Sequence, residues 1–460
     1  MIGRDEIDSV ARDLQVNAAD VERDYVFGWL LANLFGQSRL RDRLVLKGGN
    51  ALRKGYFENT RYSDDLDFTM SGGVSLNELR KELLAICAAT SAGSGVTFLN
   101  DEAVVQEKRR IDEQLQVFEA RLYFRDFYGK QGHVRVKVRI DVTQFERLHL
   151  PATQRPLLHG YSDASSCQGT ITCVKLEEIL ASKLKCLLQR RRVADLFDYV
   201  HWLFFGSENV DTRLVISTFL HKTIYSRQPS AALELLLNLP LQILRDAWTK
   251  YIVCPARAAL AFETALGRFA EHVRSIFAPF GATDHAWFSR RVFFPSALRN
   301  VILDAGSRLT LVKMKYQGAE RLVEPYSLRY KQKKDGDARE YFYGFDRTGG
   351  RSSGPQMKSF VADAFQSAEP TDISFEPQYD VEVSKAGDLA VAGRFVSRRA
   401  VPGFGVSRRR GFPGPIYTFR CSLCHRLFAH RTYDPTLREH SNGRGSHCVG
   451  STGVYIGTRW

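Results

Sequence analysis

Two aspartates one residue apart, Asp65 and Asp67, follow a pair of glycines, and this combination restricts the fold more than any other feature of the chain. Side chains on a strand alternate between its two faces, so we expect both carboxylates on one face, with Leu66 and Phe68 pointing into a core. Two carboxylates this close repel each other and stay ionised at low cost only when a cation neutralises them. Hard oxygen ligands suit Mg²⁺. The pattern therefore predicts a strand that carries a magnesium pair.

The glycine pair comes directly after the apolar run 44–46 and predicts a strand-to-helix turn. Gly48 and Gly49 have no side chain, so their backbone amides can approach phosphate oxygens closely, with a helix N-terminus behind them and Asn50 as a short polar contact. An ordinary turn followed by a solvated acidic strand explains either half of the pattern alone. The two halves in this order favour a site for a polyphosphate and its metal ions.

Asp141 is predicted to add a third carboxylate from a neighbouring strand. Residues 133–141 alternate strictly: Val and Ile occupy one face, and Arg135, Lys137, Arg139 and Asp141 share the other. Asp141 thus ends a basic stripe. A strand-end aspartate that faces water is the alternative, and it stays open.

Other segments form an ordered set with these motifs. The set consists of 21–26, the turn at 47–49, 61–68, a lysine-bearing helix at 176–190 and an acidic motif at 195–199. In this order the segments resemble the AbiEii/AbiGii-type nucleotidyltransferase toxins, over about residues 10–275. The resemblance implies an α/β (α+β) nucleotidyltransferase domain with a helical C-terminal part.

The resemblance also implies roles for individual residues. The catalytic set would be Asp65, Asp67, Asp141, Lys183 and Asp195, of which the first three bind Mg²⁺. The nucleotide-binding set would be Lys47, Gly48, Gly49, Asn50, Ser63 and Lys183. Lys183 would neutralise the triphosphate, and Asp195 would position or deprotonate the acceptor hydroxyl.

Alternatives and departures accompany these roles. Lys183 can equally be a solvated lysine on a helix surface, and Asp195 can be salt-bridged to Arg191 or Arg192. The family commonly has Thr or Ser at the position of Asn50 and usually an arginine at that of Ala194. The second departure puts one contact to phosphate or carboxylate in doubt.

The implied reaction is transfer of a nucleoside monophosphate from an NTP to RNA, with the tRNA 3′ end as acceptor by resemblance. A toxin or antiphage-defence role restrained by an antitoxin protein follows from the same analogy. A protein NMP-transferase of the AMPylase kind and a non-catalytic nucleic-acid sensor are the alternatives.

The charge balance favours an anionic partner, because the formal net charge is +14 and the sequence pI is about 9.4. From Arg394 to the C-terminus the basic residues are all arginines, which favours forked phosphate contacts and predicts nucleic-acid binding there. No stretch is long and apolar enough to span a membrane, and the N-terminus has no signal-peptide core, so a cytoplasmic protein is expected.

The rest of the chain predicts two further modules. Short alternating strands from 309 to 360 indicate a small β-barrel, which resembles a WYL-type (SH3-like) ligand-sensing domain without its Trp-Tyr-Leu signature. Arg321 and Lys358 are its candidate ligand contacts, against the alternative of surface charges. The predicted domains are 1–282, with helices from 206 onwards, 296–386 for the barrel, and 387–460 for an Arg-rich segment and a zinc finger.

Cys421, Cys424, His440 and Cys448 predict the zinc site of that finger. Two thiolates spaced C-x₂-C with two later ligands are the tetrahedral set of structural zinc. His447 is the alternative to His440, and the remaining five cysteines are scattered as in ordinary cores.

Overall fold

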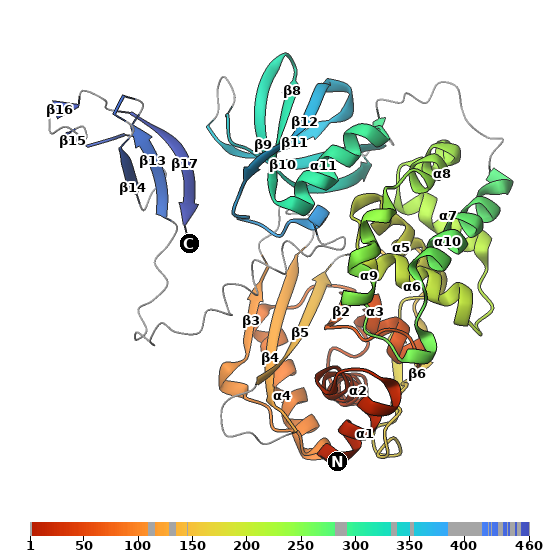
Figure 1. The fold of residues 1–460 in the computed structure, drawn as a ribbon. Coiled ribbons are helices and arrows are strands. Elements are labelled where there is room, and N and C mark those ends of the chain that lie inside the picture. Colours follow the sequence, from red (N-terminus) through yellow and green to blue (C-terminus); the bar gives the residue numbers. More distant parts are fainter. Residues whose placement is uncertain are drawn as a thin grey trace. The chain divides into compact units, whose positions relative to one another are not determined.

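The structure is a computed structural model, and the elements that it contains are drawn in Figure 1. The chain forms two compact units, residues 1–393 and 394–460, which are described separately. The described residues are 2–108, 116–127, 135–144, 146–280, 292–332, 338–349, 354–384, 416–421, 423–424, 426–430, 436–438, 440–441, 447–448 and 452–459.

The first unit begins with a mixed seven-stranded sheet of order β3-β4-β5-β2-β1-β7-β6. Its strands are β1 Leu44–Lys47, β2 Asp65–Met70, β3 Val104–Glu107, β4 Val117–Arg125, β5 Arg135–Gln144, β6 Thr153–Pro156 and β7 Thr170–Cys173. The pairs β2–β5 and β1–β7 are parallel and the others are antiparallel. The strand predicted around Asp65 is therefore β2, with Leu66 and Phe68 buried as expected.

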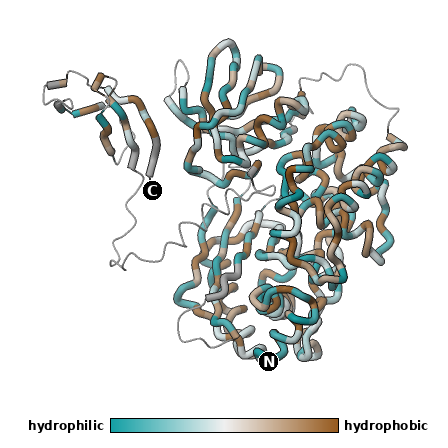
Figure 2. Tube along the Cα trace, in the orientation of Figure 1, coloured by the Kyte–Doolittle hydropathy of each residue, from teal (hydrophilic) through white to brown (hydrophobic). Residues whose placement is uncertain are grey.

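Helices cover this sheet and extend beyond it (Figure 1). They are α1 Arg4–Leu14, α2 Ala18–Gln37, α3 Gly48–Ala51, α4 Leu76–Ser94, α5 Leu176–Gln189, α6 Val193–Phe205, α7 Thr212–Lys222, α8 Pro229–Leu237, α9 Arg245–Tyr251 and α10 Phe262–Phe277. The helices α2 and α4 pack on each other, and α5 packs on α6 and α7. Hydrophobic and hydrophilic residues alternate along these elements (Figure 2), as expected where one face of each is buried. All helices in the described ranges are too short or too polar to span a bilayer.

A second sheet and a helix follow within the same unit. The helix is α11 Ser296–Arg308, and the antiparallel strands are β8 Thr310–Tyr316, β9 Ala319–Gln332, β10 Ala338–Asp346, β11 Gln356–Val361 and β12 Phe365–Ser374. Their order is β11-β10-β9-β8-β12, so the sheet is open among the described residues and the small barrel that the sequence predicts is not shown. The helix α11 and the turn η9, Glu382–Ser384, pack on the sheet and complete its core, so closure is not needed to bury the apolar face. The candidate ligand contacts Arg321 and Lys358 both pair with the buried Asp346, at 2.5 and 2.9 Å.

A buried arginine joins the second sheet to the helices before it. Arg299 on α11 forms an ion pair with Glu340 at 2.5 Å, and it donates hydrogen bonds to the Leu188 carbonyl oxygen at the end of α5 and to the Tyr225 hydroxyl. Arg299 and Glu340 are both fully buried. This joint explains why two predicted domains share one compact unit.

The second unit contains the small sheet β14-β13-β17 and the pair β15–β16. The strands are β13 Ile416–Cys421, β14 Leu427–His430, β15 His440–Ser441, β16 His447–Cys448 and β17 Gly453–Arg459. Its described core consists of Phe419, Cys421, Phe428, Leu437 and Cys448. The arginine-rich stretch that begins at Arg394 lies mostly outside the described residues, and so does the side chain of His447.

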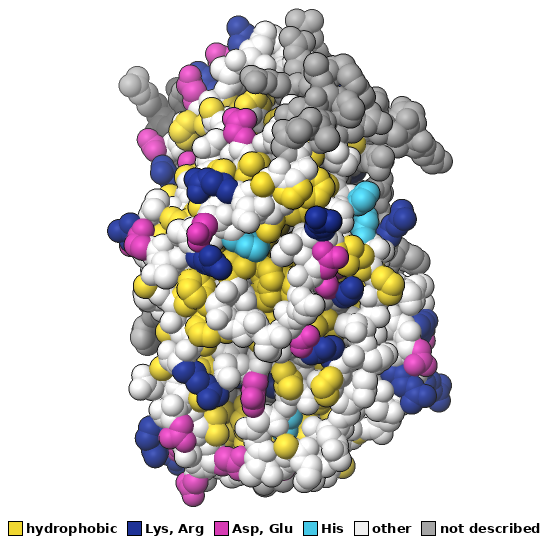
Figure 3. Space-filling model, turned by 90° about the vertical axis from the view of Figure 1, so that its right-hand side faces the viewer, with side chains coloured by type: hydrophobic (Ala, Val, Ile, Leu, Met, Phe, Trp, Pro, Cys, Tyr) yellow, Lys and Arg dark blue, Asp and Glu magenta, His cyan; other side chains and the backbone are white. Residues whose placement is uncertain are grey.

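On the face drawn in Figure 3, basic side chains are interspersed with acidic ones.

One buried histidine on α6 predicts a pH-dependent stability. His201 packs against the rings of Phe57, Phe197 and Phe205, and burial lowers its pKa from 6.5 to about 4. The unfolded chain therefore binds a proton that the folded chain excludes, so stability is complete above pH 6.5 and is lost as the pH falls toward 4. We expect His201 to lower the free energy of unfolding by about 2 kcal/mol between pH 7 and pH 5.

The measurement is urea unfolding of the wild-type chain and the His201→Leu variant at both pH values. Leucine has a similar volume and does not titrate, so the variant should lose that part of the pH dependence. Equal pH dependence in the two proteins would contradict the assignment.

Candidate active site

Three carboxylates lie together on two adjacent parallel strands. Asp67 on β2 is directly opposite Asp141 on β5 in the strand register, and Asp65 is opposite Arg139. Asp65, Asp67 and Asp141 all line one cavity of about 530 Å³. The structure thus brings together the three aspartates that the sequence predicts as metal ligands.

The three carboxylates differ in how much positive charge surrounds them, and Asp67 has too little to keep its pKa low. Burial, and then the charge of Asp65, raises the pKa of Asp67 to about 6. Burial also raises the pKa of Asp65, but Arg139 and Arg192 outweigh it and the net shift is downward. Arg139 contacts Asp65 directly, whereas no hydrogen bond from the described residues reaches the buried Oδ1 of Asp141. A buried carboxylate oxygen without a donor, beside an aspartate short of a counter-charge, fits a Mg²⁺ site.

The glycine turn abuts the same carboxylates. Gly48 begins α3 in the left-handed region, with a φ of +75°, and a Cβ there would lie 2.7 Å from Asp67 Oδ2. A Cβ on Gly49 would lie 2.8 Å from Ser63 Oγ. Asn50 is buried and donates to the Asp65 carbonyl oxygen at 2.6 Å. A side chain at either position would thus crowd its neighbours, which favours glycine at both, and the approach of their amides to phosphate oxygens stays a prediction.

The Gly48→Ala variant is expected to lose activity at least ten-fold. The left-handed backbone costs a non-glycine residue about 1–2 kcal/mol, and the new methyl group would displace the Asp67 carboxylate, whose position controls metal geometry. Gly72→Ala is the matched control, because Gly72 also has a positive φ, +82°, but has open space around its Cβ. Initial rates and thermal unfolding of both variants should show similar destabilisation and a rate loss only for Gly48→Ala. Equal rates in the two variants would contradict this role.

Lys183 on α5 is buried and fully paired. Its Nζ lies 3.1 Å from Asp195 Oδ1 and 2.6 Å from Asp198 Oδ2. The alternative of a solvated surface lysine is therefore wrong. Asp198 was not singled out from the sequence, although its i, i+3 spacing from Asp195 on α6 was a usable signal.

Asp195 is salt-bridged to a different arginine from the two considered. Arg190 donates from Nε and Nη2 to Asp195, at 2.9 and 3.2 Å, whereas Arg191 pairs with Asp304 at 2.6 Å. Burial raises the pKa of Asp195, but Arg190 and Lys183 outweigh it and hold this pKa well below its usual range. Asp195 is therefore a poor proton acceptor.

Two cations that line the cavity differ from Lys183. Arg192 follows α5 and Lys185 lies on it, and neither side chain forms a hydrogen bond or an ion pair with another residue in the described part of the chain. Burial, and then the neighbouring Arg190, lowers the pKa of Arg192 to about 10. Both cations are thus available to an anionic substrate.

Lys47 has an acidic partner that sequence reasoning missed. It donates to Thr143 Oγ1 at 3.3 Å and forms an ion pair with Glu146. Burial raises the pKa of Glu146, but Lys47 outweighs it and the result is about 2. Glu146 lies beyond the end of β5, and no spacing rule pointed to it.

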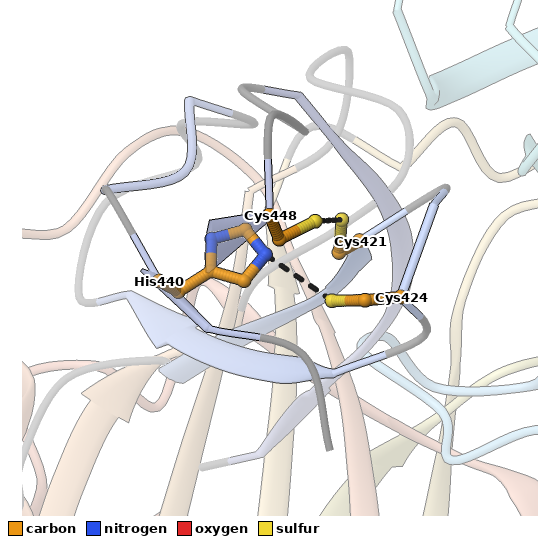
Figure 4. Close-up of side chains that lie close together, drawn as sticks. All are labelled: Cys421, Cys424, His440 and Cys448. Carbon is orange, nitrogen blue, oxygen red and sulfur yellow. Dashed lines mark hydrogen bonds between the residues drawn. The ribbon is translucent and has the colours of Figure 1, made fainter. Parts of the chain in front are cut away.

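The second unit brings the four predicted zinc ligands together (Figure 4). All their ligand atoms lie within 4.8 Å of one another, with Cys421 Sγ 3.8 Å from Cys448 Sγ and Cys424 Sγ 3.2 Å from His440 Nε2. Two thiolates at about 2.3 Å from one tetrahedral zinc are about 3.8 Å apart, far longer than a disulfide bond of about 2.05 Å. His440 Nδ1 lies 2.9 Å from the Arg438 carbonyl oxygen, which directs Nε2 to the sulfurs. The four residues fit a closed zinc site.

The first part of the chain is similar to known proteins. No curated protein matches the sequence. Among solved structures, the chain is similar to MenT4, a nucleotidyltransferase toxin from Mycobacterium tuberculosis H37Rv, with 19% identity and a TM-score of 0.39, over 61% of this chain and 94% of that chain. The family model for the nucleotidyl transferase AbiEii toxin of type IV toxin–antitoxin systems matches residues 29–272, more than half of the chain. The cavity residues from Lys47 to Arg192 all lie in the matched range, so the chain belongs to the AbiEii nucleotidyltransferase toxin family.

Proposed function

We propose that the protein is a Mg²⁺-dependent toxin that transfers a nucleoside monophosphate from an NTP to RNA. The convergence of Asp65, Asp67 and Asp141 beside the Gly48 turn is the observation that carries this proposal. Mg²⁺ held by these carboxylates would neutralise the triphosphate and activate the acceptor hydroxyl. The hydroxyl oxygen attacks the α-phosphorus in line and loses its proton to solvent, while the bond from the α-phosphorus to the bridging oxygen breaks and pyrophosphate leaves.

The residues around the carboxylates have separate parts in this proposal. The amides of Gly48 and Gly49 approach the phosphates, with Ser63 beside them. Lys183 would reach the triphosphate only by leaving Asp195 or Asp198, so its main part is to hold these two aspartates. Arg192 has no ion-pair partner among the described residues, and its charge helps to lower the pKa of Asp65, so we assign it the contact to phosphate. Asp195 positions the cations that it is paired with, and it does not take the proton of the acceptor hydroxyl, because its pKa is held low.

The acceptor that we favour is the 3′ end of tRNA, and the protein would act in the cytoplasm under the control of an antitoxin protein. The net charge of +14 suits an RNA acceptor. We also propose that Cys421, Cys424, His440 and Cys448 hold structural Zn²⁺.

The test incubates the purified chain with total RNA, Mg²⁺ and each α-labelled NTP in turn, beside an Asp65→Asn/Asp67→Asn variant. Label on a small RNA band, absent from the variant, would support the proposal and identify the nucleotide. Label on a polypeptide would replace it with a protein NMP-transferase. RNA binding without label, unchanged in the variant, would favour a non-catalytic sensor.

A further inference from the structure

Lys185 lies at the wall of the cavity where helices meet the second sheet. It projects from α5 and is half-buried, and its charged neighbours include Lys222 at the end of α7 and Arg329 on β9. Residues two apart on a helix point about 200° apart, so Lys185 faces a different side of α5 from Lys183. This wall is therefore separate from the pairs that hold Asp195 and Asp198.

The neighbours of Lys185 are each balanced by a carboxylate. Lys222 Nζ lies 2.7 Å from Glu178 Oε1, and the Glu178 carboxylate also accepts from the backbone amides of His149 and Leu150. Arg329 pairs with Glu382 at 2.5 Å, and Ser327 donates to the same carboxylate. The carboxylates of Glu178 and Glu382 at this wall are thus already paired with other cations.

Lys185 adds a positive charge that has no ion-pair partner among the described residues. Glu146 is the carboxylate whose charge acts most on the pKa of Lys185, and Glu146 is itself paired with Lys47. Burial, and then the charge of Lys222, lowers the pKa of Lys185. A half-buried cation beside two others is costly, and a bound anion would remove that cost.

We propose that Lys185 is the phosphate-binding residue of an anion subsite in this cavity, where Lys222 and Arg329, although each is paired with a carboxylate, add positive charge around it. The phosphate comes either from the NTP or from the backbone of the RNA acceptor, and the inference rests on the proposed transferase function for that choice. Because Arg329 belongs to β9, the second sheet would take part in substrate binding. Charge-assisted hydrogen bonds from ammonium and guanidinium groups suit a phosphate here.

The first experiment measures binding without turnover. Inorganic tripolyphosphate is titrated calorimetrically into the full chain in EDTA at low salt, for the wild type, Lys185→Met and Lys185→Arg. Loss of the charge should weaken binding at least ten-fold, and arginine should preserve it.

Lys175→Met is the matched control, since Lys175 lies on the N-terminal side of the same helix and outside the cavity lining. Equal affinities of wild type and Lys185→Met would overturn the subsite, and if Lys185→Met failed to fold, loss of binding in Lys185→Gln with retention in Lys185→Arg would decide in its favour.

The second experiment identifies the source of the phosphate. A rise in KM for the NTP alone would assign the subsite to the triphosphate, and a rise in KM for RNA alone would assign it to the acceptor. Unchanged KM values for both substrates would overturn the proposal. Tripolyphosphate binding by the Asp67→Asn variant, and its loss on adding Lys185→Met, would support the subsite even if no transferase activity were found.

Discussion

The Asp67→Asn variant is expected to lose at least about three orders of magnitude in the rate of nucleotide transfer, which corresponds to about 4 kcal/mol. Asparagine keeps the shape of the side chain but removes the negative charge that holds the metal ion between β2 and β5. Burial and Asp65 already disfavour the ionised form of Asp67, so the substitution should leave the fold intact or stabilise it. Single-turnover label incorporation and thermal unfolding measure the two effects separately.

Asp64→Asn is the matched control for this prediction. Asp64 precedes the same strand, but its side chain is 85% exposed and pairs with Arg23 at 2.6 Å, away from the cavity lining. This control should retain wild-type rates, because an exposed ion pair contributes little. A stable Asp67→Asn protein with more than a tenth of the wild-type rate would exclude the proposed metal site.

The Cys448→Ser variant is expected to lose bound zinc and the folded state of the second unit. Zinc binding contributes about 10–16 kcal/mol to the folding of small zinc modules, and serine cannot replace a thiolate ligand. The described core of this unit is small, namely Phe419, Cys421, Phe428, Leu437 and Cys448, so little else holds it together. The first unit has its own cores and should remain folded.

Zinc content per chain and the number of thiols that react with a maleimide measure this effect. The wild type should hold one zinc, and the variant should hold none and expose Cys421 and Cys424. Cys254→Ser is the control, since Cys254 is a half-buried thiol outside the cluster, and it should keep one zinc. A metal-free wild type with a folded second unit would refute the zinc assignment.

The sequence could predict whatever depends on local spacing. Strand alternation put Asp65 and Asp67 on one face, and the glycine pair after an apolar run predicted the strand-to-helix turn at Gly48 and Gly49. The interval between Cys421 and Cys424 indicated a metal knuckle whose later ligands the structure brings into range. The sequence could not decide between a barrel and an open sheet, because alternation shows that a strand has a buried face but not what covers it, and here α11 and η9 cover the sheet.

The sequence by itself therefore determined the family, the strand that carries Asp65 and Asp67, and the expectation of a third aspartate on a neighbouring strand. Only the tertiary structure decided which cations are already paired. Lys183 is paired with Asp195 and Asp198, whereas Arg192 and Lys185 have no such partner among the described residues. Burial and ion pairing depend on contacts between segments far apart in the chain, such as α5 and β9. Local sequence patterns do not show which of these segments come into contact.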